Sequence, residues 1–204
     1  MHKIVISGGP HAGKTTLWHA LKGEYPRATF VPEPATSLMT RERRERAEDP
    51  SHRPLDPKRN FSAFAPAVLR ESIVLESQIS TDADLVFQDR SLVDAIGYFR
   101  LNNVETLMSE VERHIAKASY SLVFFCELID GFTPGGIRSE KSFDECSIVH
   151  ERLREAYIES GLPIVYLPAV PVEDRVSMVM RSLLTVLRVG EVNSVKNIHD
   201  NGSC

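Results

Sequence analysis

A glycine-containing segment near the amino terminus has the residue types and the spacing needed to hold phosphate groups. It follows the P-loop pattern of Gly, four residues, Gly, Lys and then Ser or Thr. Glycines at both ends of the pattern allow a backbone whose N–H groups converge on phosphate oxygens. The spacing therefore predicts a phosphate cradle, and the alternative is a glycine turn without a ligand. The residues of the predicted cradle are Gly8, Gly9, Pro10, His11, Ala12, Gly13, Lys14, Thr15 and Thr16.

Lys14 and the two threonines have different expected roles in this cradle. The Lys14 ammonium should reach the β- and γ-phosphates of a nucleotide, and the Thr15 hydroxyl should bind Mg²⁺. Thr16 is expected in the first turn of a helix, with an accessory phosphate contact. The apolar run Ile4–Ile6 precedes the pattern, and helix-compatible residues follow it. Strand, loop and helix in this order favour phosphate binding, because the positive end of the helix dipole faces the anion.

Two acidic residues, Glu33 and Asp89, end apolar runs that we expect to be strands, and ligands of open α/β sheets bind at the carboxyl ends of strands. Asp89 is expected to hold Mg²⁺ directly or through a water molecule; alternatively it caps the segment that begins at Ser91. Glu33 is expected to accept a proton from an acceptor hydroxyl; alternatively it orders a metal-bound water or lies in a solvated turn. Arg90 either contacts phosphate or acceptor, or forms an ion pair with a neighbouring carboxylate.

The segment 133–139 combines glycines with an arginine, in the order Thr-Pro-Gly-Gly-Ile-Arg-Ser. We predict a lid here that closes over the nucleotide and brings Arg138 to the transferred phosphoryl group, where it would neutralise developing charge. The alternative is a simple turn with a solvated arginine. His11, inside the cradle, is interpreted as a variable loop residue rather than a catalyst, and the histidine spacing does not indicate a zinc site.

The segment 41–60 is rich in charge and proline and is expected to be an insertion that folds over a substrate. Its first part predicts a solvent-exposed helix with ion pairs four residues apart, and an acceptor-side phosphate site is the alternative. The predicted pairs are Arg41 with Glu45, Glu42 with Arg46 and Arg44 with Glu48.

Short apolar runs alternate with longer segments of helical period, which is typical of a parallel sheet covered on both faces. The expected strands are residues 3–7, 29–32, 85–88, 121–126 and 163–167. Helices are expected over 66–80, 104–118 and 143–159 and from about residue 172, with Pro66 at the start of the first. In the last helix the inward residues should be Val176, Met180, Leu183 and Leu187. These elements predict one α/β domain over 1–189, with a lid at 131–142 and a polar tail at 190–204.

Composition limits the possible partners and compartments. A net charge of −4 over 204 residues argues against a protein that mainly coats nucleic acid or an acidic membrane. Cys126, Cys146 and Cys204 are odd in number and widely spaced, so neither a disulfide framework nor a zinc site is indicated. The first expected strand leaves no room for a signal peptide, and no apolar run reaches the roughly 18 residues of a membrane span. We therefore expect a cytoplasmic protein; the sequence does not indicate its oligomeric state.

Four stretches of the chain match the motifs of one known family: Ile6–Thr16, Val31–Ala35, Phe87–Tyr98 and Pro168–Val176. They resemble NadR-like, AAA-type P-loop ATPase and kinase domains, and more distantly deoxynucleoside and thymidylate kinases. The run Asp-Arg-Ser-Leu-x-Asp-Ala and the ending Glu-Asp-Arg-Val are more particular to this family than the P-loop is. The resemblance extends over residues 2 to about 185.

The resemblance implies a five-stranded P-loop NTPase fold of the nucleoside and nucleotide kinase type, with Mg²⁺ and ATP bound at the cradle. It would put Asp89 near Mg²⁺, Glu33 facing an acceptor or water, and Arg138 in the lid. It would also put Ala169 and Pro171 beside the nucleotide base. A departure concerns Phe64, which is followed by Ala65 where deoxynucleoside kinases usually have a Gln that reads a base.

Two functions from different classes remain open at this point. The first is a small-molecule kinase that phosphorylates a nucleoside or a related metabolite. The second is a nucleotide-dependent binding or regulatory protein in which slow hydrolysis gates the lid and the insertion. P-loop folds carry many functions, so the fold alone does not separate them. A metabolite that accelerates ADP formation and emerges phosphorylated would indicate the first function.

Overall fold

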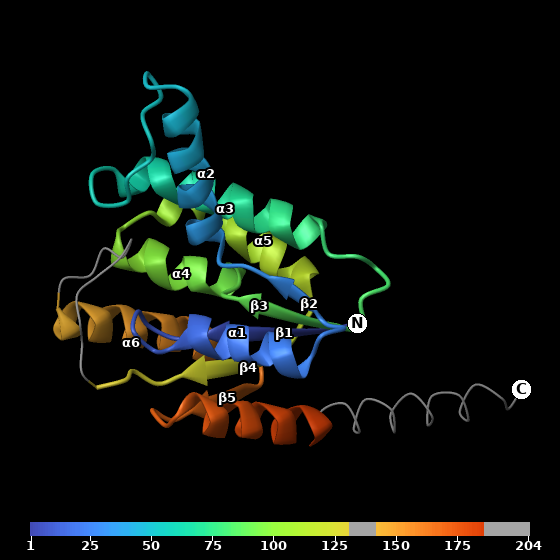
Figure 1. Ribbon diagram of the computed structural model, residues 1–204. Helices are drawn as coiled ribbons and strands as arrows, with labels where there is room; N and C mark the ends of the chain where they lie inside the picture. The colour runs from blue at the N-terminus through green and yellow to red at the C-terminus, as the bar shows by residue number, and fades with distance from the viewer. Residues whose placement is uncertain (131–141, 186–204) are drawn as a thin grey trace, which may run out of the picture.

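The computed structural model describes residues 1–130 and 142–185, and its centre is a five-stranded parallel sheet (Figure 1). The strand order is β2-β3-β1-β4-β5. The strands are β1 (His2–Ser7), β2 (Thr29–Val31), β3 (Leu85–Asp89), β4 (Tyr120–Cys126) and β5 (Ile164–Leu167). All five predicted strands are confirmed, and each end lies within one residue of its predicted position. The parallel α/β fold predicted from the alternating apolar runs is therefore the observed one.

Strand β1 is the central strand of the sheet, and its pairing determines where the segment directly after it lies. Its residue Ile6 pairs with Asp89 on β3, and Ser7 pairs with Phe125 on β4. Because all strands are parallel, their carboxyl ends meet at one edge of the sheet. The segment after β1 therefore lies between the ends of β3 and β4.

Helices cover both faces of the sheet. They are α1 (Lys14–Glu24), α2 (Pro34–Glu48), α3 (Phe61–Ser77), α4 (Leu92–Leu101), α5 (Met108–Ala118) and α6 (Phe143–Glu159), with a 3₁₀ turn η1 (Glu105–Leu107) and a helical segment at 172–185. Val5 faces a core shared with α3, α4, α5 and α6. Ile4 and Ile6 face the opposite core, shared with α1 and the segment 172–185. This alternation follows from the two-residue side-chain period of a strand. None of the helices within 1–130 and 142–185 has the length and apolar content needed to cross a membrane.

Helix α3 begins five residues earlier than predicted, so Pro66 lies inside it rather than at its start. The side chain of Asn60 accepts a hydrogen bond from the Ala63 backbone N–H at 3.0 Å and caps the helix. Phe64 and Ala65, the two residues that precede Pro66, are buried. The cap and this burial stabilise a first turn that the proline signal alone does not reveal. The predicted helix at 104–118 is divided into η1 and α5.

In the last helix, one of the predicted inward residues is wrong. Met180 is 38% exposed, whereas Val179 and Leu183 are buried in the core beside α1. The buried face thus follows the spacing 176, 179 and 183 rather than 176, 180 and 183, and both spacings suit a helix with 3.6 residues per turn. Leu187 and the tail 190–204 lie outside the part of the chain that the structure describes.

The first part of the charged segment, residues 41–48, forms the second half of α2, which projects away from the sheet in Figure 1. Two predicted pairs are present, Arg41 with Glu45 and Arg44 with Glu48, each at 3.9 Å. The third is wrong. The loop after α2 folds back, so Glu42 accepts a hydrogen bond from the Leu55 backbone N–H at 3.0 Å and lies 3.0 Å from His52 Nε2. Arg46 instead donates to backbone carbonyls of that loop, a tertiary contact that helical spacing does not encode.

Candidate functional site

The P-loop lies between β1 and α1, where its backbone requires glycine at two positions. Gly8 has a φ of 133°, and a Cβ added there would lie 2.4 Å from the carbonyl oxygen of Cys126. Gly13 has a φ of 73° and precedes the first turn of α1. A φ in this range is strained for residues with a side chain. Both glycines therefore allow the close turn that the sequence pattern predicts, and the loop ends at the amino terminus of a helix, a position that favours anions.

Lys14 begins α1 and points back over the loop that precedes it. Its Nζ donates a hydrogen bond to the Gly9 carbonyl oxygen at 2.7 Å, and the residue is only 5% exposed. Burial and the nearby Arg90 lower the pKa of Lys14 to about 8, although Asp89 and Glu33 oppose this shift. A bound polyanion would favour the charged form of this amine. Thr15 and Thr16 are exposed, with Thr15 lining the cavity described below.

Asp89 ends β3, and its carboxyl group is buried with an unsatisfied oxygen. Asp89 is 4% exposed, and Oδ1 has no hydrogen-bond partner within residues 1–130 and 142–185. Burial, followed by the charge of Glu33, raises its pKa to about 6, against the opposing effects of Lys14 and Arg90. A buried carboxylate oxygen without a donor suits a divalent cation.

The alternative role of Asp89, as a cap of the next helix, is wrong. Ser91 caps α4, because its Oγ accepts from the Val93 backbone N–H at 3.1 Å. Asp94 completes a capping box by accepting from the Ser91 backbone N–H at 2.9 Å. Asp89 is therefore not occupied in holding the start of α4.

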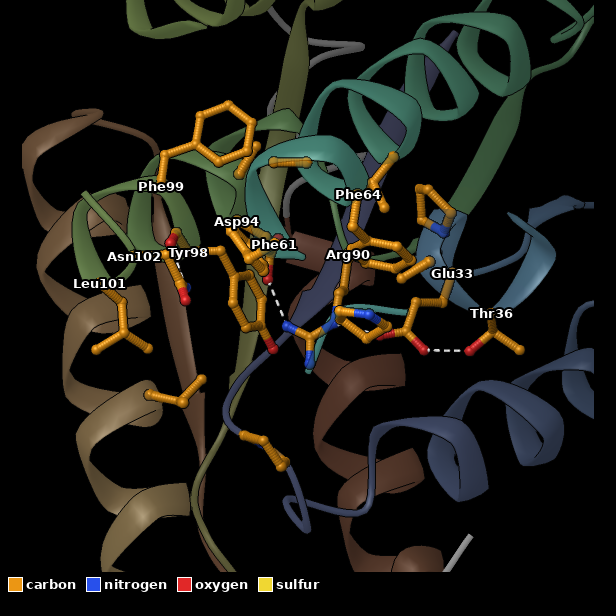
Figure 2. Close-up of a pocket in the computed structure, with 18 of the residues that line it drawn as sticks. Glu33, Thr36, Phe61, Phe64, Arg90, Asp94, Tyr98, Phe99, Leu101 and Asn102 are labelled. Atoms are coloured by element: carbon orange, nitrogen blue, oxygen red, sulfur yellow. Dashed lines mark hydrogen bonds and ion pairs between the residues drawn. The ribbon is translucent and has the colours of Figure 1, made fainter. Parts of the chain in front are cut away.

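Glu33 and Arg90 form an ion pair across the carboxyl ends of β2 and β3 (Figure 2). Arg90 Nε donates to Glu33 Oε1 at 2.6 Å, and Thr36 Oγ1 donates to Glu33 Oε2 at 2.6 Å. Burial opposes ionisation of Glu33, but the positive charges of Arg90 and Lys14 outweigh it and lower its pKa to about 2. Glu33 is thus a carboxylate at neutral pH. Of the two roles considered for Arg90, the structure shows the ion pair with a neighbouring carboxylate.

Asp94 on α4 is buried and accepts several hydrogen bonds. The motifs in the sequence did not predict a role for it in the site. Its Oδ1 accepts from Arg90 at 2.8 Å and from Ser7 Oγ at 2.7 Å. Its Oδ2 accepts from the Tyr157 hydroxyl on α6. The spacing Ser-x-x-Asp from residue 91 is a capping-box signal that could have located Asp94. Its contacts with β1 and α6 depend on the fold, because they join residues 87 and 63 positions apart.

A cavity of about 780 Å³ opens beside these charged groups. Lys14, Thr15, Glu33 and Arg90 are among its polar lining residues. Figure 2 shows Glu33 and Arg90 together with aromatic side chains of α3 and α4, Phe61, Phe64, Tyr98 and Phe99, around this cavity. Its apolar lining includes Met39, Phe61, Phe64, Val68, Leu69, Tyr98, Phe99, Leu101, Ile148 and Val149. The apolar spacing 61, 64, 68 on α3 signals a helical face, but the sequence does not say that this face borders a cavity.

The remaining predicted site residues lie elsewhere. Ala169 and Pro171 are exposed in the loop after β5. Arg175 joins this loop to the P-loop, because its Nε donates to the Pro168 carbonyl at 2.7 Å and its guanidinium also donates to the Ala12 carbonyl. Arg138 and the predicted lid lie outside the described residues, except for Ser142, which caps α6.

Within the P-loop, three further predicted residues have distinct positions. Pro10 lines the cavity, and Ala12 is fully buried. His11 has a left-handed φ of 61°, and its carbonyl accepts from the Ile129 backbone N–H at 3.4 Å. The structure therefore brings Lys14, Thr15 and Glu33 to one cavity, and Asp89 is close enough to Lys14 and Glu33 for their charges to shift its pKa.

The strand order 2-3-1-4-5, with a glycine loop between β1 and α1, defines a P-loop NTPase fold of the nucleoside and nucleotide kinase type. The chain belongs to the AAA domain family, whose sequence model matches residues 3–175. A comparison with curated proteins finds no significant match.

Solved structures with this fold include three P-loop proteins. The deoxyadenosine kinase from M. mycoides with bound dATP has a TM-score of 0.56 at 16% identity, over 90% of this chain and 99% of that one. The thymidylate kinase from Candida albicans has a TM-score of 0.56 at 13% identity, over 90% and 91%. The NadR protein in complex with NR has a TM-score of 0.60 at 22% identity, over 81% of this chain but 43% of NadR. These likenesses confirm the predicted resemblance and the fold.

Proposed function

We propose that this protein is a Mg-ATP-dependent kinase that transfers the γ-phosphoryl group to a hydroxyl of a nucleoside-like or related small metabolite. The observation that carries the proposal is the cavity itself. Its lining combines Lys14 of the P-loop and the Glu33–Arg90 pair with apolar and aromatic side chains. An acceptor bound there would present its hydroxyl beside the P-loop, as transfer requires.

The residues of this chain fit Mg²⁺ and a nucleotide. The turn between Gly8 and Gly13 and the start of α1 suit phosphates, and Lys14 would contact the β- and γ-phosphates. Asp89 Oδ1, which has no hydrogen-bond partner among the described residues, and the hydroxyl of the exposed Thr15 would hold the metal. Mg²⁺, when bound, neutralises phosphate charge. Ala169 and Pro171 would lie beside the base, Arg138 would cover the phosphates, and the preference for ATP rests on the family resemblance.

Glu33 is suited to orient the acceptor rather than to remove its proton early. A carboxylate with a pKa near 2 is a weak base, and general bases work best with a pKa near the working pH. Phosphoryl transfer needs little proton removal before the transition state, because it depends mainly on positioning and charge stabilisation. Arg90 holds Glu33 at 2.6 Å and so fixes the direction in which the carboxylate accepts a hydrogen bond from the acceptor hydroxyl.

The charges around the cavity favour an uncharged acceptor. Among the described lining residues the cations are Lys14, Lys58 and Arg90. Lys14 is assigned to the nucleotide, and Arg90 is already paired with Glu33 and Asp94. Of the cations that line the cavity in the described part of the chain, only Lys58, which is exposed, is left for a phosphorylated acceptor. Phe61, Phe64 and Tyr98 provide aromatic surface for a flat ring. A nucleoside-like acceptor therefore fits better than a nucleotide.

The test is a screen of pooled nucleosides and nucleoside monophosphates with Mg-ATP, which measures ADP formation and identifies products by mass spectrometry. We expect one neutral nucleoside-like compound to accelerate ADP formation and to gain one phosphate. Slow ADP formation that no metabolite accelerates would favour a nucleotide-gated regulatory protein instead. A monophosphate as the preferred acceptor would overturn the assignment of an uncharged substrate.

A further inference from the structure

The backbone of Gly9 is held from both sides by side chains. Its N–H donates to Nδ1 of His150, on α6, at 3.1 Å. Its carbonyl oxygen accepts from Lys14 Nζ at 2.7 Å. A Cβ added at Gly9 would lie 2.7 Å from the Cβ of His150, so α6 packs directly against the loop. One residue thus links the imidazole of His150 to the lysine assigned to the phosphates.

The other side of the His150 ring is held by Glu127, at the end of β4. His150 Nε2 lies 3.1 Å from Glu127 Oε2, and Arg154 donates to both carboxylate oxygens of Glu127 at 2.9 Å. The Gly9 N–H can only donate, so Nδ1 is the acceptor and the proton of the neutral ring is on Nε2. Glu127 therefore fixes the tautomer that Gly9 requires.

Glu127 is also joined to the far half of the loop through its backbone. Its carbonyl oxygen accepts from Arg175 at 3.1 Å, and Arg175 donates to the carbonyl of Ala12 as well. His150 holds the loop at Gly9, and Arg175 holds it at Ala12. Glu127 takes part in both contacts, because its carboxylate contacts His150 and its backbone carbonyl accepts from Arg175. Glu127 therefore stabilises both halves of the cradle.

We propose that neutral His150 is a positioning residue of the P-loop: by accepting the Gly9 N–H it keeps the cradle and Lys14 in the arrangement that binds a polyphosphate. The inference rests on the proposed function, in that the loop is taken to bind a nucleotide. His150 is 3% exposed, so water does not replace it easily as a partner for Gly9. Loss of the acceptor leaves a buried N–H unpaired, which is costly.

The proposal predicts a dependence on pH. The groups facing His150 are Glu127 from the end of β4, Arg154 and Glu151 from α6, and the ring of Phe125 at 4.9 Å. Burial lowers the pKa of His150, and Arg154 reinforces the shift while Glu127 partly offsets it. The ring is therefore neutral at pH 7. As the pH falls below 6.5 and through the lowered pKa, the ring gains a proton on Nδ1 and can no longer accept from Gly9.

Three substitutions separate this role from simple packing. In His150→Asn, Oδ1 takes the place of Nδ1 and can accept from Gly9, but the side chain does not titrate. In His150→Gln the polar group reaches instead toward the position of Nε2, and His150→Phe keeps a ring without an acceptor. Glu155→Gln, an exposed change on the same helix, is the control. Circular dichroism and the Tm of each variant report whether it folds.

Binding of ADP and of ATP with Mg²⁺ is then measured by calorimetry between pH 5 and 8. We expect affinity to fall about tenfold in His150→Phe and His150→Gln, and to stay within about threefold of wild type in His150→Asn and Glu155→Gln. Acidification should weaken binding more in wild type than in His150→Asn; the phosphates titrate in both, so the difference isolates His150. Equal losses in Asn and Phe, or matching acid profiles in wild type and Asn, would overturn the proposal.

A second measurement needs no nucleotide. NMR of ¹⁵N-labelled protein should show His150 with the proton on Nε2 at pH 7, and slow hydrogen exchange at the Gly9 amide in wild type and in His150→Asn but not in His150→Phe. If wild type binds no nucleotide, the proposed function fails, while this readout still decides the contact. A ring proton on Nδ1 at pH 7, or rapid Gly9 exchange in wild type, would refute the positioning role.

Discussion

Arg90 Nε lies 2.6 Å from Oε1 of Glu33, and this pair joins the end of β3 to the start of α2. Arg90 reaches Glu33 from a backbone with a φ of 71°, a left-handed conformation that is strained for arginine. Its backbone N–H is held by the Ile6 carbonyl at 3.0 Å, and its guanidinium by Asp94 at 2.8 Å. The orientation of the candidate acceptor-binding carboxylate is therefore set by the central strand and by α4.

Glu33→Gln should separate acceptor phosphorylation from nucleotide binding. The amide keeps the size of the side chain. It loses the negative charge that pairs with Arg90 and that strengthens the hydrogen bond from the acceptor hydroxyl. We expect phosphoryl transfer to fall by about a hundredfold or more, with ATP affinity within about threefold of wild type. Steady-state kinetics and calorimetry measure the two quantities, and Thr36→Val, which removes only the second contact of Glu33, is the milder comparison. Full acceptor phosphorylation by Glu33→Gln would exclude the proposed role.

The same substitution should change how stability depends on pH. The pKa of Glu33 is lowered to about 2 in the fold, so the stabilisation from its charged form is complete above the ordinary value of 4.5 and is lost as the pH falls toward 2. We expect wild type to lose more stability than Glu33→Gln between pH 4.5 and 2. Urea unfolding at several pH values tests this, and parallel curves for the two proteins would contradict the shift.

Lys14→Ala should abolish stabilisation of the protein by nucleotides. In the proposed function the buried ammonium of Lys14 pairs with the β- and γ-phosphates, and charged hydrogen bonds are among the strongest. We expect the increase in Tm caused by Mg-ATP to disappear, while Lys22→Ala, an exposed lysine on the same helix, keeps it. Unchanged ATP binding by Lys14→Ala would contradict the assignment of the cradle.

Nucleotide affinity should also fall at alkaline pH. Lys14 has a pKa of about 8 in the free protein, so above that pH the amine is mostly neutral and must take up a proton when phosphate binds. We expect affinity to decrease by up to about tenfold for each pH unit above 8. In Lys14→Arg the decrease should be much smaller, since guanidinium stays charged. Calorimetry between pH 7 and 9.5 decides this, and a flat wild-type profile would refute the prediction.

Asp89→Asn should weaken the Mg²⁺ response without weakening the fold. Burial and Glu33 raise the pKa of Asp89 to about 6, so its negative charge at pH 7 costs stability in the absence of a cation. The amide removes that charge, and we expect the Tm of the free protein to stay equal or to rise by about a few degrees. The additional increase in Tm that Mg²⁺ gives with ATP should shrink. A large fall in the Tm of the free variant would show a structural role instead.

The sequence by itself determined the strands and the shape of the P-loop, because both depend on local geometry. A run such as Ile4–Ile6 is buried on both faces of a parallel sheet, and Gly8 and Gly13 are needed wherever the loop turns as it does. Parallel pairing then brings Glu33 and Asp89 to the carboxyl edge of the sheet, as predicted. Helix boundaries were less well determined, since the start of α3 depends on the Asn60 cap and on burial of Phe64.

Only the tertiary structure decided the partners of these groups. Arg90 pairs with Glu33 and Asp94, and His150 accepts a hydrogen bond from Gly9, which lies 141 residues away in the sequence. Such contacts depend on how helices from distant parts of the chain pack on the sheet edge, and a side chain's spacing in the sequence does not record them. The aromatic cavity could not be predicted for the same reason. A helical face that packs in the core and one that lines a cavity have the same apolar period in the sequence, and only the surface opposite the helix distinguishes them.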